Sequence, residues 1–246
     1  MPSHVMILGC GRSGTSIFGE LFEQLPGYTY HSEPDFGIVC QLDYSTPQAI
    51  KVPRESPGHE PTPGLSFPIG EMLRLATPRL VWFWIVRHPL DAIASLRVGI
   101  AQNWGHHPRP PDWQDWLNKP ILAQCAHHWN HINSVGCAHV GDLAHVVQFE
   151  SMIADPLEFA RHVCRTAGLD PESAKPQLLA WATRVQDSNT AQFVEAKTSR
   201  AYSRPDHTHR VGRWRENLSS EEIEQIVPLV RHTAQRFGYG LPTGRN

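Results

Sequence analysis

The sequence predicts an α/β fold with a central parallel sheet flanked by helices. Three short apolar segments, residues 4–8, 80–86 and 145–149, have the composition of buried strands. Each is followed by a segment of helical character, and this alternation favours parallel strands. No internal repeat and no linker between two cores is present, so we expect one domain over residues 1–246.

The expected elements follow in chain order. In the first part of the chain they are a strand at 4–8, a glycine-rich loop at 9–14, a helix at 14–25, a short strand at 28–30, an ambiguous stretch at 35–50 and a proline-rich loop at 51–68. The remaining ones are a helix at 69–76, the strand at 80–86, a helix at 89–98, a loop at 103–112, a long amphipathic helix at 113–138, the strand at 145–149, helices at 156–167 and 174–185, a polar loop at 187–210 and a capped helix at 219–237.

Composition excludes several classes of protein. The formal net charge of −2 gives no overall basic field, so we expect no nucleic-acid partner. No apolar run approaches the ~20 residues that span a bilayer, so no membrane span is predicted. The five cysteines are scattered, and the first strand begins too early to leave room for a targeting segment. These features predict a cytoplasmic protein with free thiols.

The glycine-rich loop has the character of a phosphate-binding site. It lies between an apolar strand and a helix, where backbone N–H groups and the helix dipole attract an anion. Its expected ligand-binding residues are Gly11, Arg12, Ser13, Gly14, Thr15 and Ser16. Thr15 occupies the position at which a nucleoside-triphosphate P-loop has lysine. The loop therefore favours a phosphate anion over the β- and γ-phosphates of MgATP.

A second phosphate site is expected after the strand at 80–86. Arg87 follows that strand, and Ser95 lies eight positions later on the next helix. Since ligands of open α/β sheets bind at the carboxyl ends of the strands, Arg12 and Arg87 should face the same crevice.

With these two sites the chain resembles the PAPS-dependent sulfotransferases, where PAPS is 3′-phosphoadenosine 5′-phosphosulfate. The likeness extends to Lys51-Val52-Pro53, to the segment from Phe149 to Pro156, and to Val211-Gly212-Arg213-Trp214. It is closer to the carbohydrate and tyrosylprotein branch than to the phenol and steroid branch. Phe149 stands where the family has tyrosine, so one hydrogen bond to the cofactor would be missing.

The resemblance implies a P-loop-like sulfotransferase fold and the transfer of a sulfuryl group from PAPS to a hydroxyl or amine. The acceptor would be a small molecule or a carbohydrate, the product adenosine 3′,5′-bisphosphate (PAP), and no metal would be required. Glu33 would be the base, and Lys51 the cation on the leaving group. The residues expected to close over the 3′-phosphate and adenine are Ser199, Arg200, Arg210 and Gly212.

Two other functions remain open. A P-loop kinase or NTPase would share the superfold, but Thr15 and the lack of a clear strand-end aspartate count against it. A module that binds a nucleotide bisphosphate without catalysis is the second, and the presence of Glu33 and Lys51 counts against it.

Histidines are numerous in the middle of the chain. His127 and His131 share a helix face, but no third ligand is apparent in the sequence, so no metal site is predicted. An aromatic and histidine-rich patch is a candidate wall for an acceptor pocket or a lid; its members are Trp104, His106, His107, Trp113 and Trp116.

Overall fold

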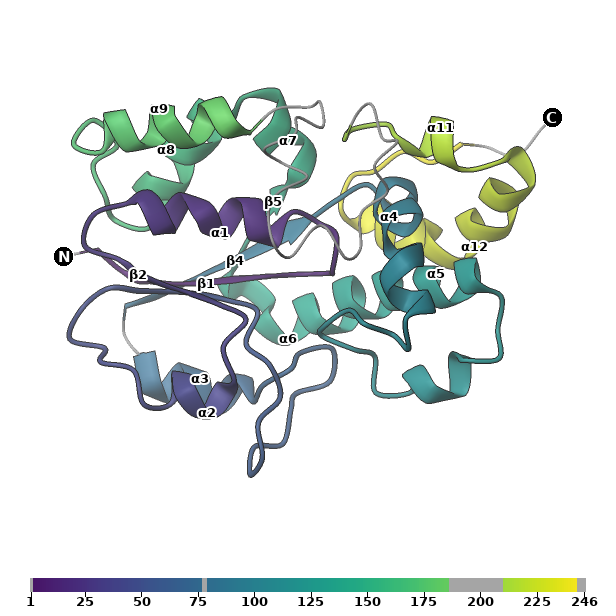
Figure 1. The fold of residues 1–246 in the computed structure, drawn as a ribbon, viewed down its shortest axis with the longest axis horizontal. Helices are drawn as coiled ribbons and strands as arrows, with labels where there is room; N and C mark the ends of the chain where they lie inside the picture. Colours follow the sequence, from purple (N-terminus) through teal and green to yellow (C-terminus); the bar gives the residue numbers. More distant parts are fainter. Residues whose placement is uncertain (1, 77–78, 186–209, 243–246) are drawn as a thin grey trace.

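The computed structural model describes residues 2–76, 79–185 and 210–242. Its sheet has five parallel strands in the order β2-β3-β1-β4-β5 (Figure 1). They are β1 (His4–Gly9), β2 (Thr29–Ser32), β3 (Gln48–Lys51), β4 (Leu80–Val86) and β5 (Ala144–Gln148). The parallel α/β fold predicted from the sequence is confirmed.

The central strands are buried on both faces, which is why their sequences are continuously apolar. Alternate residues enter two separate cores: Met6 and Trp84 face one, whereas Ile7 and Phe83 face the other. Five parallel strands with a hydrophobic core on each side require helices on both faces.

The helices form two layers around this sheet (Figure 1). One face is covered by α1 (Thr15–Gln24), α7 (Phe149–Ala154), α8 (Pro156–Thr166) and α9 (Lys175–Arg184). The other face is covered by α2 (Phe36–Val39), α3 (Ile69–Ala76), α4 (Pro89–Ala101), α5 (Ile121–His131), α6 (Cys137–Val140) and α12 (Ser220–Arg236). The short α11 (Trp214–Asn217) contacts α4.

The predicted helix at 113–138 is wrong as a continuous element. A single 3₁₀ turn, η1 (Trp113–Trp116), precedes α5, which begins only after Pro120. Proline lacks the N–H that a helix interior uses and disfavours helical backbone in the residue before it, so Pro120 favours the start of a new helix here. A π-helical segment, η2 (Ile132–Gly136), then joins α5 to α6, and the 3₁₀ turn η3 (Gly141–Leu143) leads into β5.

Two further predictions need correction. The ambiguous stretch and the start of the proline-rich loop contain β3, so Lys51 ends a strand in the sheet instead of lying in a loop. Phe149 begins α7 and is not the last residue of β5. The other predicted strands and helices through residue 185, and the capped C-terminal helix, are present to within a few residues.

Among the described residues, no helix is both long and apolar enough to cross a membrane. All five cysteines are free thiols.

Candidate functional site

The glycine-rich loop connects β1 to α1 at the carboxyl edge of the sheet. Gly14 has a φ of 94°, a left-handed conformation that glycine adopts without strain. It also packs against the ring of Phe149, which leaves no space for a Cβ atom. The buried Ser13 hydroxyl has no hydrogen-bond partner among the described residues. A buried polar atom of this kind at a helix N-terminus fits an anionic ligand.

The two predicted phosphate subsites are in direct contact. Arg12 Nε donates to Ser95 Oγ at 3.0 Å, and Arg87 donates to the Arg12 carbonyl at 3.0 Å. Ser95 reaches the loop because Pro89 begins α4 and places Ser95 on its second turn. The structure thus brings Arg12, Arg87 and Ser95 together at the carboxyl ends of β1 and β4, as their positions in the sequence predict.

A C-terminal segment closes this edge and adds two buried arginines. Arg87 donates to the carbonyl of Arg210, and Arg213 is only 6% exposed. The Asp91 carboxylate on α4 holds the segment by accepting from the backbone N–H groups of Gly212 and Trp214 at 2.7 and 2.8 Å. Two functional candidates that the sequence did not single out are therefore Arg213 and Asp91.

The arginines around the two subsites repel one another. Burial and the charge of Arg87 lower the pKa of Arg12 to about 10. Burial and the charges of Arg87 and Arg12 lower the pKa of Arg213 to about 9. Like charges packed at low solvent exposure are stabilised when an anion binds between them, so this arrangement fits a phosphate-bearing ligand.

The buried Lys51 and the partly exposed Glu33 form an ion pair beside the loop. Lys51 Nζ lies 2.7 Å from Glu33 Oε1 and donates to Ser16 Oγ at 3.2 Å. The Lys51 side chain is fully buried at the end of β3, while Glu33 is 29% exposed and also pairs with Arg54 at 2.7 Å. Parallel pairing of β2 with β3 sets Ser32 opposite Lys51, which places Glu33 beside it.

These contacts control the charge of both groups. Burial alone would raise the pKa of Glu33, but the positive charges of Lys51 and Arg54 outweigh it and lower the pKa to about 2. Burial lowers the pKa of Lys51, and the charge of Glu33 opposes that shift. Glu33 is therefore an ionised carboxylate and, in this state of the protein, a weak base.

A cavity of about 170 Å³ opens where these groups meet. Its lining residues are Gly11, Arg12, Thr15, Ser16, Glu33, Val52, Arg54, Gly105, His106 and His107. Three of them, Arg12, Glu33 and Val52, have positive φ angles of 65°, 51° and 41°. Strained backbone of this kind is concentrated at functional sites, and β-branched Val52 is a marked outlier.

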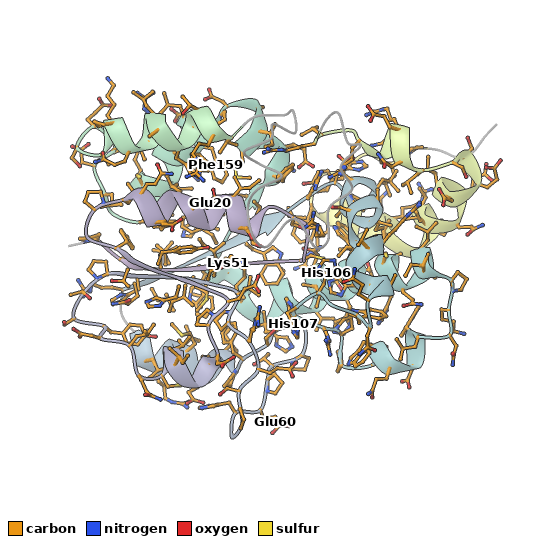
Figure 2. All side chains as sticks on the ribbon, viewed as in Figure 1. Glu20, Lys51, Glu60, His106, His107 and Phe159 are labelled. Atoms are coloured by element: carbon orange, nitrogen blue, oxygen red, sulfur yellow. The ribbon has the colours of Figure 1, made fainter. Side chains whose placement is uncertain are left out.

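Two histidines also line this cavity. Figure 2 shows His106 and His107 close together near the carboxyl edge of the sheet, beside α4. Burial and the charge of Arg12 lower the pKa of His106 to about 3, and burial also lowers the pKa of His107. Both are neutral at physiological pH. The two histidines of the predicted patch thus line the cavity, together with Arg54, which no sequence pattern indicated.

Ser199 and Arg200 lie outside the described residues. Every other residue expected from the sequence to bind the donor lies at this edge of the sheet, together with Glu33 and Lys51.

Comparison with known proteins was made at the level of sequence and of structure. No family model matches this chain, and no curated protein matches it. Solved structures do match. Mouse sulfotransferase SULT7A1, solved in complex with PAP, superposes with a TM-score of 0.60 over 95% of this chain and 85% of its own, at 15% identity.

The chain has the sulfotransferase fold. The sulfotransferase domain from the curacin biosynthetic pathway covers 98% of this chain and 99% of its own length, with a TM-score of 0.56 and 12% identity. Sulfotransferase STF9 from Mycobacterium avium covers 99% of this chain and 79% of its own, with a TM-score of 0.54 and 14% identity. The sulfotransferase fold thus spans nearly the whole chain, at sequence identities that carry no information on substrates.

Proposed function

We propose that this protein transfers a sulfuryl group from PAPS to a hydroxyl or amine of a polar small molecule or carbohydrate. The observation that carries the proposal is the pair of contiguous cationic subsites, joined by the contact between Arg12 and Ser95, with Glu33 and Lys51 at one end. PAPS carries negative charge at its 5′-phosphosulfate and at its 3′-phosphate. Each of these charges would face one of the two cationic subsites. The solved neighbours that contain PAP support the same donor.

In this proposal the loop residues bind the 5′-phosphosulfate, and Arg87 and Ser95 bind the 3′-phosphate. Arg210, Arg213, Ser199 and Arg200 would close over the 3′-phosphate and adenine, with Gly212 shaping the turn of that segment. When bound, PAPS supplies the sulfuryl group and a phosphate leaving group, and the residues present supply charge and position for an in-line displacement.

Lys51 would couple donor binding to the basicity of Glu33. Its ammonium contacts Glu33 and the loop residue Ser16 at once, so a small rotation would transfer it from the carboxylate to the donor phosphate. Loss of that contact would raise the pKa of Glu33 from about 2 towards its ordinary value. Glu33 would thus become an effective base only after the donor has bound.

The proton balance of the transfer is then simple. The acceptor oxygen or nitrogen forms a bond to sulfur as its proton passes to Glu33. The bond from sulfur to the bridging oxygen breaks, and the electron pair remains on the phosphate of PAP, where Lys51 and Arg12 offset its charge. No step in this scheme uses a metal ion.

The cavity lining favours a polar acceptor. Arg54, His106 and His107 are polar residues of the lining, and Val52 is its principal apolar side chain. An acceptor with several hydroxyl groups would satisfy these side chains better than a flat apolar one.

The test is calorimetric titration with PAP, with adenosine 5′-phosphate and with ATP plus Mg²⁺. We expect metal-independent PAP binding that is much tighter than binding of adenosine 5′-phosphate, because only PAP fills both subsites. Arg87→Met should reduce the affinity for PAP to that for adenosine 5′-phosphate. Arg74→Met on α3 is the control and should leave both affinities unchanged. Preferential binding of MgATP would favour the kinase alternative and contradict the proposal.

A further inference from the structure

Three potential metal ligands meet where the segment after α4 crosses α5. His127 and His131 are one helical turn apart, so their side chains share a face of α5. Asp112, from the preceding irregular segment, places Oδ1 2.8 Å from His127 Nε2. One ligand atom from each residue lies within 4.8 Å of the other two. Asp112 is therefore the third candidate ligand, which was not apparent in the sequence.

The surrounding groups hold these side chains in place. Trp116 Nε1 donates to Asp112 Oδ2 at 3.1 Å, which orients the carboxylate. The Trp116 indole stacks on the His127 ring, with 3.9 Å between the centroids and 7° between the planes. Hydrogen bonds and packing of this kind fix the ligands of metal sites in the orientation needed for binding.

One atom of the cluster lacks a partner. His131 Nε2 is buried and makes no hydrogen bond within the described part of the chain. Leaving a buried ring nitrogen unpaired is unfavourable, and such an atom calls for an explanation. The Asp112 side chain is 43% exposed, so an ion and a completing water ligand have access from solvent.

We propose that Asp112, His127 and His131 bind a divalent transition-metal ion, with zinc as the best fit. Two imidazole nitrogens and one carboxylate oxygen, without a thiolate, form a ligand set that zinc accepts with water in the fourth position. Tetrahedral zinc with ligands at about 2.0–2.2 Å separates those ligands by roughly 3.3–3.6 Å. The contact between Asp112 and His127 would open by less than 1 Å, and His131 Nε2 would gain a bond.

The ion would have a structural role at a distance from the proposed chemistry. The segment that ends in Asp112 also carries His106 and His107, which line the cavity. Binding of Asp112 to two residues of α5 would fix that segment against the helix and hold the cavity wall in place. The proposal is independent of the transfer reaction, since it concerns metal binding alone.

A second cluster in the structure provides an internal control. Cys40, His59 and Glu71 also have ligand atoms within 4.8 Å of one another. Here the polar atoms already have partners: Cys40 Sγ donates to Glu71 Oε1 at 3.6 Å, and His59 Nδ1 lies 3.0 Å from Glu71 Oε2. Among the described residues, this cluster has no buried ring nitrogen without a hydrogen-bond partner, so it makes no comparable demand for a cation.

The experiment is a zinc titration of the metal-stripped full chain, monitored by calorimetry and by the melting temperature. We expect one equivalent to bind and to raise the melting temperature. His131→Ala should reduce the affinity by a factor of about 100 or more, and Trp116→Phe, which keeps the stacking but loses the hydrogen bond to Asp112, by about tenfold. Cys40→Ser should bind zinc like the wild type.

Two results would overturn the proposal. One is the absence of stoichiometric zinc binding by the wild-type chain. The other is zinc binding that survives His131→Ala and is lost in Cys40→Ser, which would place the ion at the second cluster. Circular dichroism of each variant without metal establishes that it is folded, and PAP titration separates this result from the proposed function.

Discussion

At the scale of single residues, the site depends on charges that are buried together. Lys51 has no solvent exposure and is neutralised chiefly by Glu33, whose other oxygen binds Arg54. Removing Glu33 leaves the buried Lys51 charge uncompensated, which costs more than removing both members of the pair.

Glu33→Gln should therefore destabilise the protein by about 2–4 kcal/mol, and the double variant Glu33→Gln/Lys51→Met should recover part of that loss. The comparison is made by urea unfolding at pH 7. The exposed pair of Glu158 and Arg165 is the matched control, for which Glu158→Gln should have little effect. A double variant that is no more stable than Glu33→Gln alone would contradict this coupling between the two residues.

The same pair has a defined pH dependence. The pKa of folded Glu33 is about 2, below its ordinary value of 4.5, so its stabilisation is present above pH 4.5 and is lost as the pH falls towards 2. Unfolding between pH 5 and pH 2.5 should show a smaller acid-induced loss for Glu33→Gln than for the wild type.

Arg213 should contribute to ligand binding but not to the stability of the unliganded protein. Its charge is repelled by Arg87 and Arg12, so Arg213→Met should leave the melting temperature of the unliganded protein unchanged or higher. PAP affinity should fall at least tenfold, because a cation near the proposed 3′-phosphate site is lost. The two quantities are measured by differential scanning fluorimetry and calorimetry; a loss of both would indicate a structural role instead.

At the scale of elements, the π-helical segment η2 shows why the middle of the chain was hard to predict. The helical periodicity at 113–138 is real, but Pro120 delays α5, and η2 changes the register before α6. A Cβ at Gly136 in η2 would lie 2.5 Å from the carbonyl oxygen of Gly64 and 2.8 Å from Trp84 Cη2. The close approach of these segments is a tertiary contact that periodicity does not encode.

Gly136→Ala should consequently destabilise the protein by about 1–3 kcal/mol, since backbone and a buried indole must move to accept the methyl group. Gly70→Ala on α3 is the matched control. Its Cβ would meet nothing closer than 4.0 Å, so the higher helix propensity of alanine should leave stability unchanged or slightly increased. Equal effects at the two positions in urea unfolding would rule out the steric explanation.

The strand-loop-helix unit at the N-terminus was predictable because local signals agree there. From His4 to Gln24 the sequence runs from apolar strand residues through glycines to helix-forming residues. Each of these local patterns indicates the element that is found there. β3 was missed because Gln48-Ala-Ile-Lys51 is short, ends in a charged residue and becomes a strand only by pairing with β1 and β2. The predicted strand-end arginines and Ser95 lie together because the strands are parallel and their carboxyl ends meet at one edge. Asp112, in contrast, contacts His127 through the path of an irregular segment, which residue spacing does not predict.

At the scale of the whole molecule, buried histidines link folding to pH. His128 is fully buried, accepts from Trp104 Nε1 and lies near His106. Burial and neighbouring histidines hold the pKa of His128 well below 6.5, and that of His106 is about 3. The unfolded chain takes up protons below pH 6.5 that the folded chain does not.

Stability should therefore be fully present above pH 6.5 and decline as the pH falls below it, by about 1 kcal/mol per buried histidine at pH 5.5. Gln at position 128 can still accept from Trp104, so His128→Gln should show a smaller difference in urea midpoint between pH 7.5 and pH 5.5. A pH dependence identical to that of the wild type would exclude His128 as a contributor.

The placement of the free thiols gives the molecule a built-in probe. Cys40 is half-buried, whereas Cys10, in the proposed phosphate loop, has no solvent exposure, and burial raises its pKa. An alkylating reagent should consequently modify Cys40 first and reach Cys10 only when the edge of the sheet opens. The rate of Cys10 modification thus reports how often the loop region opens, and its slowing by PAP would measure ligand protection without any knowledge of the acceptor.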